Sequence, residues 1–257
     1  MCIRDSPKAF DADKHLTSSN FCYCGAMPRA TGLRERKKLE QRQRIADAAA
    51  ALFAKHGYDG VSINDVAIAA DVSYQTVYNY FPAKQDLGLD RAEEIRDRYD
   101  RVVRERPTGS SPAAALWPLA HADIDRFRDC DPDVARGQHP ALCVTSVVFR
   151  GFALLARERD VEAVAAAIVD TSSAIRPLVA RAHAASLIAV VQAVTDRIGE
   201  HVLAGDVSSV VADDLQREGA AAFGVLDHQF SIALQRDVPP LDAPSVVTAR
   251  LSARPRS

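Results

Sequence analysis

The sequence predicts an all-α protein in which a small N-terminal domain is followed by a larger helical domain. Its 257 residues, 47% of them hydrophobic and 6% aromatic, are enough for one small and one larger hydrophobic core. Alanine is abundant, and most β-branched residues fall inside repeats of helical spacing. No alternation of apolar and polar residues between turn signals persists along the chain, so β-strands are not expected.

The first predicted helix runs from about Leu39 to His56 and ends at Gly57. Its apolar positions follow the spacing i, i+4, i+7, i+8 and i+11: Ile45, Ala49, Leu52, Phe53 and His56. This spacing gives the helix one apolar stripe, and the glycine is expected to form a left-handed C-terminal cap. The helix can therefore complete a core with the two short helices that follow it.

Two short helices are predicted between Ser62 and Phe81, joined by a turn at Asp71-Val72. Ser62 and Asp65 have the spacing of a capping box, which starts a helix of about two turns. Ser73 is expected to cap the second helix. Two helices joined by so short a turn are typical of the helix-turn-helix motif, whose second helix docks in the DNA major groove.

The second of these helices has more polar side chains than a buried helix needs. Val77 and Phe81 fall on one apolar stripe. The remaining side chains are predicted to face outward: Tyr74, Gln75, Thr76, Tyr78 and Asn79. Because these side chains carry hydrogen-bonding groups, they favour a role in DNA recognition over a role in the core.

A basic segment lies at the start of the first helix. Between Arg34 and Arg44 there are six basic residues and two acidic ones, although the whole chain has a net charge of -2. On its own, such a run is usually a solvated helix end. Beside a helix-turn-helix motif it favours contact with DNA phosphates, since the sequence-independent part of DNA affinity comes from released counterions.

Residues 31–88 resemble the N-terminal DNA-binding domain of TetR-family transcriptional regulators. The resemblance is carried by the combined register of G-L-R-E-R-K-K, R-I-A-D-A-A-A-A-L-F-A-K-H-G-Y-D-G-V-S-I-N-D-V-A and D-V-S-Y-Q-T-V-Y-N-Y-F-P-A-K-Q-D-L, and it covers about a quarter of the chain. One departure is Asp71, at a turn position where the family more often has glycine. Aspartate tolerates the left-handed conformation better than most residues, so the turn should form.

The resemblance implies two sets of DNA contacts. The side chains expected to read bases are Asn64, Tyr74, Gln75 and Asn79. Those expected to bind phosphates are Ser62, Thr76, Tyr78, Tyr80 and Lys84. A glutamine can make two hydrogen bonds to an adenine edge, and hydroxyl and ammonium groups suit phosphate oxygens. Two alternatives stay open: one ring of Tyr78 and Tyr80 completes the three-helix core, and Gln75 is simply exposed to solvent.

Beyond this unit the sequence predicts a charged connecting helix from about Lys84 to Arg106, ended by a Pro- and Gly-containing break at residues 107–112. Further helices are predicted at about 113–128, 140–156 and 160–171. We divide the chain into 27–88, a DNA-binding domain; 89–106, a connecting helix; 107–236, a helical ligand-binding and dimerisation domain; and 237–257, a loose C-terminal tail.

Two long alanine-rich helices are predicted at about 175–203 and 207–234, separated by Gly205-Asp206. Alanine lets neighbouring helices approach closely, and two such helices per subunit can form a four-helix bundle about a two-fold axis. Similar regulators dimerise at this place. The resemblance therefore implies a homodimer whose two DNA-binding domains bind a palindromic operator in double-stranded DNA.

The hypothesis that follows is a repressor released from its operator by a small-molecule effector of unknown identity, which binds the DNA-free form selectively. The candidate lining residues are Trp117, His121, Phe149 and Phe152. The alternative is a ligand-independent DNA-binding regulator whose C-terminal domain serves only association. An enzyme is not expected, because the chain has no glycine-rich phosphate loop, no G-x-S-x-G elbow and no H-E-x-x-H helix. No cofactor and no metal are expected.

Residues 1–26 do not fit the helical pattern and lack the apolar segment of a signal peptide. Met27 looks like a natural start for a member of the family, so residues 1–26 are expected to be non-native or disordered. A metal site made by His15, Cys22 and Cys24 is the alternative, although this set has no familiar zinc spacing and no fourth ligand.

The cellular compartment is predicted from the other two cysteines and from hydropathy. Cys130 and Cys143 are single cysteines, expected to be buried or inert, which suits a reducing cytoplasm. No uninterrupted apolar stretch reaches the roughly 18 residues that a membrane span needs. A soluble, cytoplasmic protein is therefore expected.

Overall fold

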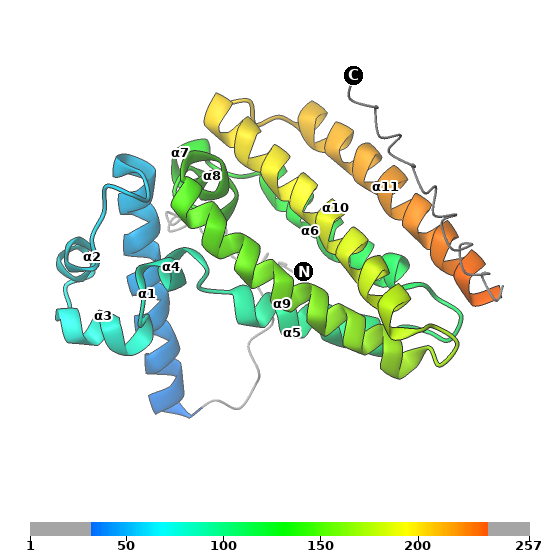
Figure 1. The fold of residues 1–257 in the computed structure, drawn as a ribbon. Helices are drawn as coiled ribbons and strands as arrows, with labels where there is room; N and C mark the ends of the chain where they lie inside the picture. Colours follow the sequence, from blue (N-terminus) through cyan, green and yellow to red (C-terminus); the bar gives the residue numbers. More distant parts are fainter. Residues whose placement is uncertain (1–31, 236–257) are drawn as a thin grey trace, which may run out of the picture.

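The computed structural model describes residues 32–235, which form α-helices without any strand in that part of the chain (Figure 1). The helices are α1 Leu33–His56, α2 Ile63–Ala69, α3 Tyr74–Tyr80, α4 Lys84–Gly88, α5 Ala92–Arg104, α6 Pro112–Arg128, α7 Pro132–Ala135, α8 His139–Thr145, α9 Val147–Thr171, α10 Pro177–Ala204 and α11 Ser209–Gln235. The predicted all-α class is confirmed. The segments 1–26 and 237–257, with the alternative metal ligands His15, Cys22 and Cys24, lie outside the described residues.

The N-terminal domain is built from α1, α2 and α3 around a small apolar core. Its most deeply buried side chains are Ile45, Ala49, Phe53, Val66, Val77 and Phe81. Helix α1 begins at Leu33, earlier than predicted, because the basic segment continues the helix with residues of high helix propensity. Gly57 ends α1 with φ 73° and ψ 158°. The cap has a positive φ, but its ψ lies outside the left-handed helical region, so the predicted left-handed cap is wrong in this respect. That backbone region is open essentially to glycine alone.

The connecting helix predicted from Lys84 to Arg106 is wrong in detail, since it divides into α4 and α5. Helix α4 ends at Gly88, a residue of low helix propensity. The carbonyl of Asp90, in the break, accepts a hydrogen bond from Arg42 Nη2 of α1 at 2.7 Å. This contact with α1 replaces the helical hydrogen bond that a continuous connecting helix would have made.

The helix boundaries predicted between residues 140 and 171 are also wrong. The chain breaks at Ser146, and α9 then runs without interruption through residues 157–160. Ser146 caps α9, because its Oγ accepts a hydrogen bond from the Phe149 amide at 3.1 Å. The same hydroxyl donates to Asp59 Oδ1 of the N-terminal domain at 3.0 Å. Helix α7, which the sequence did not predict, has Asp131 as its N-cap.

The C-terminal domain packs α5, α6, α9, α10 and α11 around one large core (Figure 1). Its deeply buried side chains include Leu116, Val164, Ala167, Ile168, Leu187 and Phe230. The two long helices predicted near the C-terminus are confirmed as α10 and α11, with Gly205 between them in the left-handed conformation at φ 70° and ψ 16°. Gly205 is therefore the cap that lets the chain reverse direction.

Helix α10 is long and apolar enough to cross a membrane by length and composition, and 28% of its most apolar stretch is buried in the protein. Such a test is weak evidence, because core helices of soluble proteins also pass it. Four charged side chains interrupt the helix: Arg181, Asp196, Arg197 and Glu200.

The two cysteines of the described residues are free. Burial raises the pKa of the Cys143 thiol to about 11, and burial with the nearby Asp131 carboxylate does the same for Cys130. Both thiols therefore stay protonated at neutral pH, which supports the prediction that they are inert.

Candidate nucleic-acid interface

Helices α2 and α3 form a helix-turn-helix unit with a cap at each N-terminus. The predicted capping box at α2 is confirmed: the Ser62 amide donates to Asp65 Oδ2 at 2.8 Å, and the Asp65 amide donates to Ser62 Oγ at 3.2 Å. The Ser62 hydroxyl also donates to Asp65 Oδ2, at 2.7 Å, and this hydrogen bond, followed by the one from the amide, lowers the pKa of Asp65. Ser73 caps α3, as predicted, by accepting from the Thr76 amide at 3.1 Å. Both helices are thus fixed at their N-termini, and the Ser73 cap lies beside the turn.

The turn between α2 and α3 depends on an unusual backbone conformation. Asp71 has φ 52° and is, among the described residues other than glycine, the one with positive φ. The prediction that aspartate takes the left-handed conformation here is confirmed. A left-handed conformation costs a residue other than Gly, Asn or Asp roughly 1–2 kcal/mol.

We expect Asp71→Val to lower the free energy of unfolding by about 1–2 kcal/mol, because a β-branched side chain is strained at positive φ. Asp71→Gly is the matched control. Since Asp71 is exposed, glycine removes no packing and should change stability by less than about 0.5 kcal/mol. Urea unfolding of the two variants measures the difference, and equal stability would contradict a strained turn.

The outer face of α3 is exposed, and it carries the side chains predicted to read bases. Tyr74 is 51% exposed, and Gln75 and Asn79 are exposed beside it. Gln75 Nε2 donates to Asn79 Oδ1 at 3.0 Å, so the two amides are held together along the helix. Asn64, on α2, is exposed as well. None of these four side chains contributes to the core, which Val77 and Phe81 fill from the opposite face.

The side chains predicted to bind phosphates have more varied surroundings. Tyr78 is 46% exposed, whereas Tyr80 is partly buried and packs against the N-terminal core. Thr76 Oγ1 lies 2.8 Å from Ser73 Oγ. Lys84 Nζ lies 4.3 Å from the centre of the Tyr58 ring, and burial lowers the pKa of the Lys84 ammonium group. The sequence left open whether the ring of Tyr78 or of Tyr80 completes the three-helix core. In the structure it is the Tyr80 ring that packs against this core.

Arg42 has a structural role that the sequence reasoning missed. Its guanidinium lies 4.4 Å from the centre of the Phe81 ring and also donates to the Asp90 carbonyl. A cation over a desolvated aromatic face contributes on the order of 1–2 kcal/mol. Arg42 therefore joins α1 to the end of α3 and to the connecting segment, and the sequence carried no local signal for this contact.

The candidate ligand residues do not come together in one place. Trp117 and His121 stack edge to face on α6, with ring centres 5.5 Å apart. Phe149 packs instead between Tyr58 and His139, with ring centres 5.0 and 5.6 Å away. Phe152, one turn further along α9, is partly buried. The predicted set therefore divides into a pair on α6 and a pair on α9.

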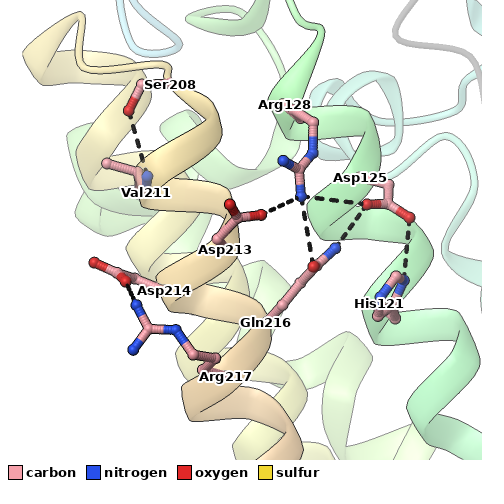
Figure 2. A network of polar contacts seen from close by, with 9 residues as sticks. All are labelled: His121, Asp125, Arg128, Ser208, Val211, Asp213, Asp214, Gln216 and Arg217. Carbon is pink, nitrogen blue, oxygen red and sulfur yellow. Dashed lines mark hydrogen bonds and ion pairs between the residues drawn. The ribbon is translucent and has the colours of Figure 1, made fainter.

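An open cavity of about 470 Å³ lies between α6 and α11 beside the pair on α6. Its lining residues are Trp117, His121, Asp213, Gln216, Arg217 and Ala220. Figure 2 shows Asp213 and Gln216 of α11 pointing toward Asp125 and Arg128 of α6. Gln216 Nε2 donates to Asp125 Oδ1 at 2.6 Å, and Arg128 Nη2 donates to Asp213 Oδ1 at 2.7 Å. Sequence reasoning missed the contribution of α11, since its residues lie far along the chain from α6.

Comparison with known proteins identifies the N-terminal unit. The family model described as "Bacterial regulatory proteins, tetR family" matches residues 45–89, which include α2, α3 and the short α4. The chain carries the DNA-binding domain of the TetR family. The similar proteins are named as transcriptional regulators.

Three relatives show how far the TetR-family likeness extends. The repressor KstR of Mycolicibacterium smegmatis is 48% identical over 78 residues, 30% of this chain and 38% of the relative. KstR of Rhodococcus jostii is 37% identical over 93 residues, 36% and 43% of the two chains. The regulator TcmR of Streptomyces glaucescens is 28% identical over 102 residues, which are 40% of this chain and 45% of the relative. The chain thus spans less than half the length of these curated relatives.

Solved structures share the fold over a longer region than the curated relatives match. The SmeT–triclosan complex is 15% identical and superimposes with a TM-score of 0.51, covering 73% of this chain and 90% of that one. NalD, the secondary repressor of an efflux pump in Pseudomonas aeruginosa, is 16% identical, with a TM-score of 0.50 and coverage of 73% and 96%. At these identities the likeness concerns the fold.

Proposed function

We propose that the protein is a homodimeric, cytoplasmic transcriptional repressor that binds a palindromic operator through α3 and leaves it when a small molecule binds the C-terminal domain. The observation that carries the proposal is the outer face of α3. It presents aromatic and amide side chains to solvent from a helix capped at its start and packed on its opposite face. A helix with those properties suits the major groove.

We assign base contacts to Asn64, Tyr74, Gln75 and Asn79, and phosphate contacts to Ser62, Thr76, Tyr78, Tyr80 and Lys84. The Gln75–Asn79 amide pair supports the first assignment, because it holds the Gln75 amide ready to pair with an adenine edge. For Tyr80, the partly buried ring leaves the hydroxyl as the group for a phosphate oxygen.

We assign the dimer interface to the outer faces of α10 and α11. These faces carry exposed apolar side chains, among them Leu178, Val179, Val210 and Val225. Alanine at exposed positions of both helices, including Ala182, Ala185, Ala189 and Ala221, leaves room for a partner's helices. Two-fold symmetry would then set two copies of α3 about one helical turn of DNA apart.

Ligand release is supported by the open cavity beside Trp117 and His121 and by the fold shared with the SmeT–triclosan complex. The word repressor in the names of the KstR relatives and of NalD supports negative control. The alternative is a regulator that needs no ligand. A screen of small molecules by thermal unfolding separates the two, because selective binding to the folded protein raises its melting temperature.

The decisive experiment is selection of DNA from a randomised duplex library by the purified full chain, followed by sequencing. We expect a palindromic site to be enriched, and its half-site spacing reports the geometry of the dimer. No enrichment at moderate ionic strength would overturn the proposed function.

Within the selected site, we expect Gln75→Ala to lose roughly 1–3 kcal/mol of discrimination at one base pair in each half-site. Lys84→Ala should instead weaken binding to all duplexes alike and reduce the salt slope by about 1. Fluorescence anisotropy at several salt concentrations measures both effects. Arg159→Ala, which removes an exposed cation from α9, a helix with no assigned contact to DNA or to the partner subunit, serves as the control and should bind as the wild type does. Unchanged specificity in Gln75→Ala would contradict the base assignment.

A further inference from the structure

We propose that Gly137 and Gly199 are positioning residues that set the angle of the DNA-reading domain on the C-terminal domain, and thereby the half-site spacing that the dimer accepts. The inference rests on the proposed function. Residues 132–145, which contain α7 and α8, form a wedge between α1 on one side and α10 on the other (Figure 1). The two glycines lie at the two contacts of this wedge.

The first contact joins the wedge to α1. A Cβ atom at Gly137 would lie 1.8 Å from the carbonyl oxygen of Ala50 and 2.8 Å from the amide nitrogen of Ala54. Both of these atoms belong to the backbone of α1, so no change of side-chain rotamer could make room. Gly137 is buried and has no positive φ, so this close approach, and not a turn, is what requires glycine here.

The second contact joins the wedge to α10. A Cβ atom at Gly199 would lie 2.3 Å from the carbonyl oxygen of Pro140 and 3.0 Å from Val144 Cγ2. Gly199 is buried in the interior of α10, where glycine costs about 1 kcal/mol relative to alanine. Close packing against the wedge is the compensating gain.

Further contacts hold the reading domain to the same wedge and to the start of α9. Ser146 donates to Asp59, and the Phe149 ring packs on Tyr58. A Cβ atom at Gly88 would lie 2.4 Å from Phe149 Cε2. The N-terminal domain therefore rests both on the wedge and on the start of α9, and it has little room to tilt by itself.

When α10 moves, the wedge must therefore move with it and displace α1. Side chains can absorb small shifts by changing rotamer, but two backbones in direct contact cannot. The wedge makes one such backbone contact with α10, at Gly199, and another with α1, at Gly137. Because α10 is assigned to the dimer interface, the packing of the partner subunit on α10 would set the angle of each DNA-binding domain through the contacts at Gly199 and Gly137.

The test compares Gly137→Ala and Gly199→Ala with Gly151→Ala in the full-length protein. Gly151 lies in α9, and a Cβ atom there would meet nothing within 4 Å, so it is the matched control. Each variant is titrated by fluorescence anisotropy with the selected palindrome, with palindromes whose half-sites are one or two base pairs closer or further apart, and with a single half-site. Thermal unfolding is recorded alongside.

We expect Gly137→Ala and Gly199→Ala to bind the selected palindrome at least tenfold more weakly and to prefer a shifted spacing, with single half-site binding retained. Gly151→Ala should match the wild type in the three DNA titrations, and its melting temperature should be equal or higher, because alanine favours a helix interior more than glycine does. Unchanged affinity and spacing in both variants would overturn the inference, and so would loss of single half-site binding together with a collapsed melting temperature, which indicates a folding defect. A wild-type protein that prefers no duplex overturns the proposed function instead, so the two failures are distinguishable.

Discussion

The Phe149→Ala variant is expected to lose about 3–5 kcal/mol of its free energy of unfolding, the cost of deleting a buried aromatic ring. Phe149 is fully buried and belongs to the core that the N-terminal domain shares with α8 and α9. Its ring contacts Tyr58 on one side and His139 on the other. The substitution therefore leaves a cavity where the two domains join.

Leu155→Ala is the control for this prediction. It removes a large apolar side chain from the same helix, but Leu155 is 66% exposed, so the change in stability should stay within about 0.5 kcal/mol. Urea unfolding measures both variants. If Phe149→Ala were as stable as Leu155→Ala, the two domains would not share a core at Phe149.

The second large effect is a loss of stability in mild acid. Burial, reinforced by the nearby positive charge of Arg157, lowers the pKa of His139 from 6.5 to about 4. The unfolded chain therefore binds a proton at His139 between about pH 6.5 and pH 4, whereas the folded protein does not. The corresponding stability is fully present above pH 6.5 and is lost as the pH falls, by about 2 kcal/mol at pH 5 and about 3 kcal/mol at pH 4.

The variant His139→Gln tests this prediction, because glutamine keeps a polar side chain that does not titrate. We expect the difference in unfolding free energy between pH 7 and pH 5 to shrink by about 2 kcal/mol relative to the wild type. His183, whose pKa burial also lowers to about 4, should leave a residual slope in the variant. An unchanged slope in His139→Gln would show that the His139 ring titrates normally in the folded protein.

The predictions that succeeded concern residues close together in the chain. The capping box of Ser62 and Asp65, the Ser73 cap and the outward face of α3 depend on spacings of three or four residues, which helical geometry fixes. The left-handed Asp71 is likewise a property of one residue and its turn. For the same reason, α10 and α11 could be predicted from apolar spacing and from the glycine between them.

The predictions that failed concern contacts between distant residues. The break at Ser146 occurs where its hydroxyl meets Asp59, a residue 87 positions away. The break after α4 lies where Arg42 meets the carbonyl of Asp90, 48 positions away. Local periodicity cannot register either contact, because each depends on how the two domains pack.

Neighbouring residues alone predict the helix-turn-helix unit and the polar, aromatic outer face of α3, since helix starts, turns and amphipathic stripes depend on short spacings along the chain. The position of Phe149 and the need for glycine at 137 and 199 become visible in the folded protein alone. No motif in the sequence singles out Gly137 or Gly199. In the folded protein both are places where two backbones touch, because packing brings together segments that the order of the chain keeps apart.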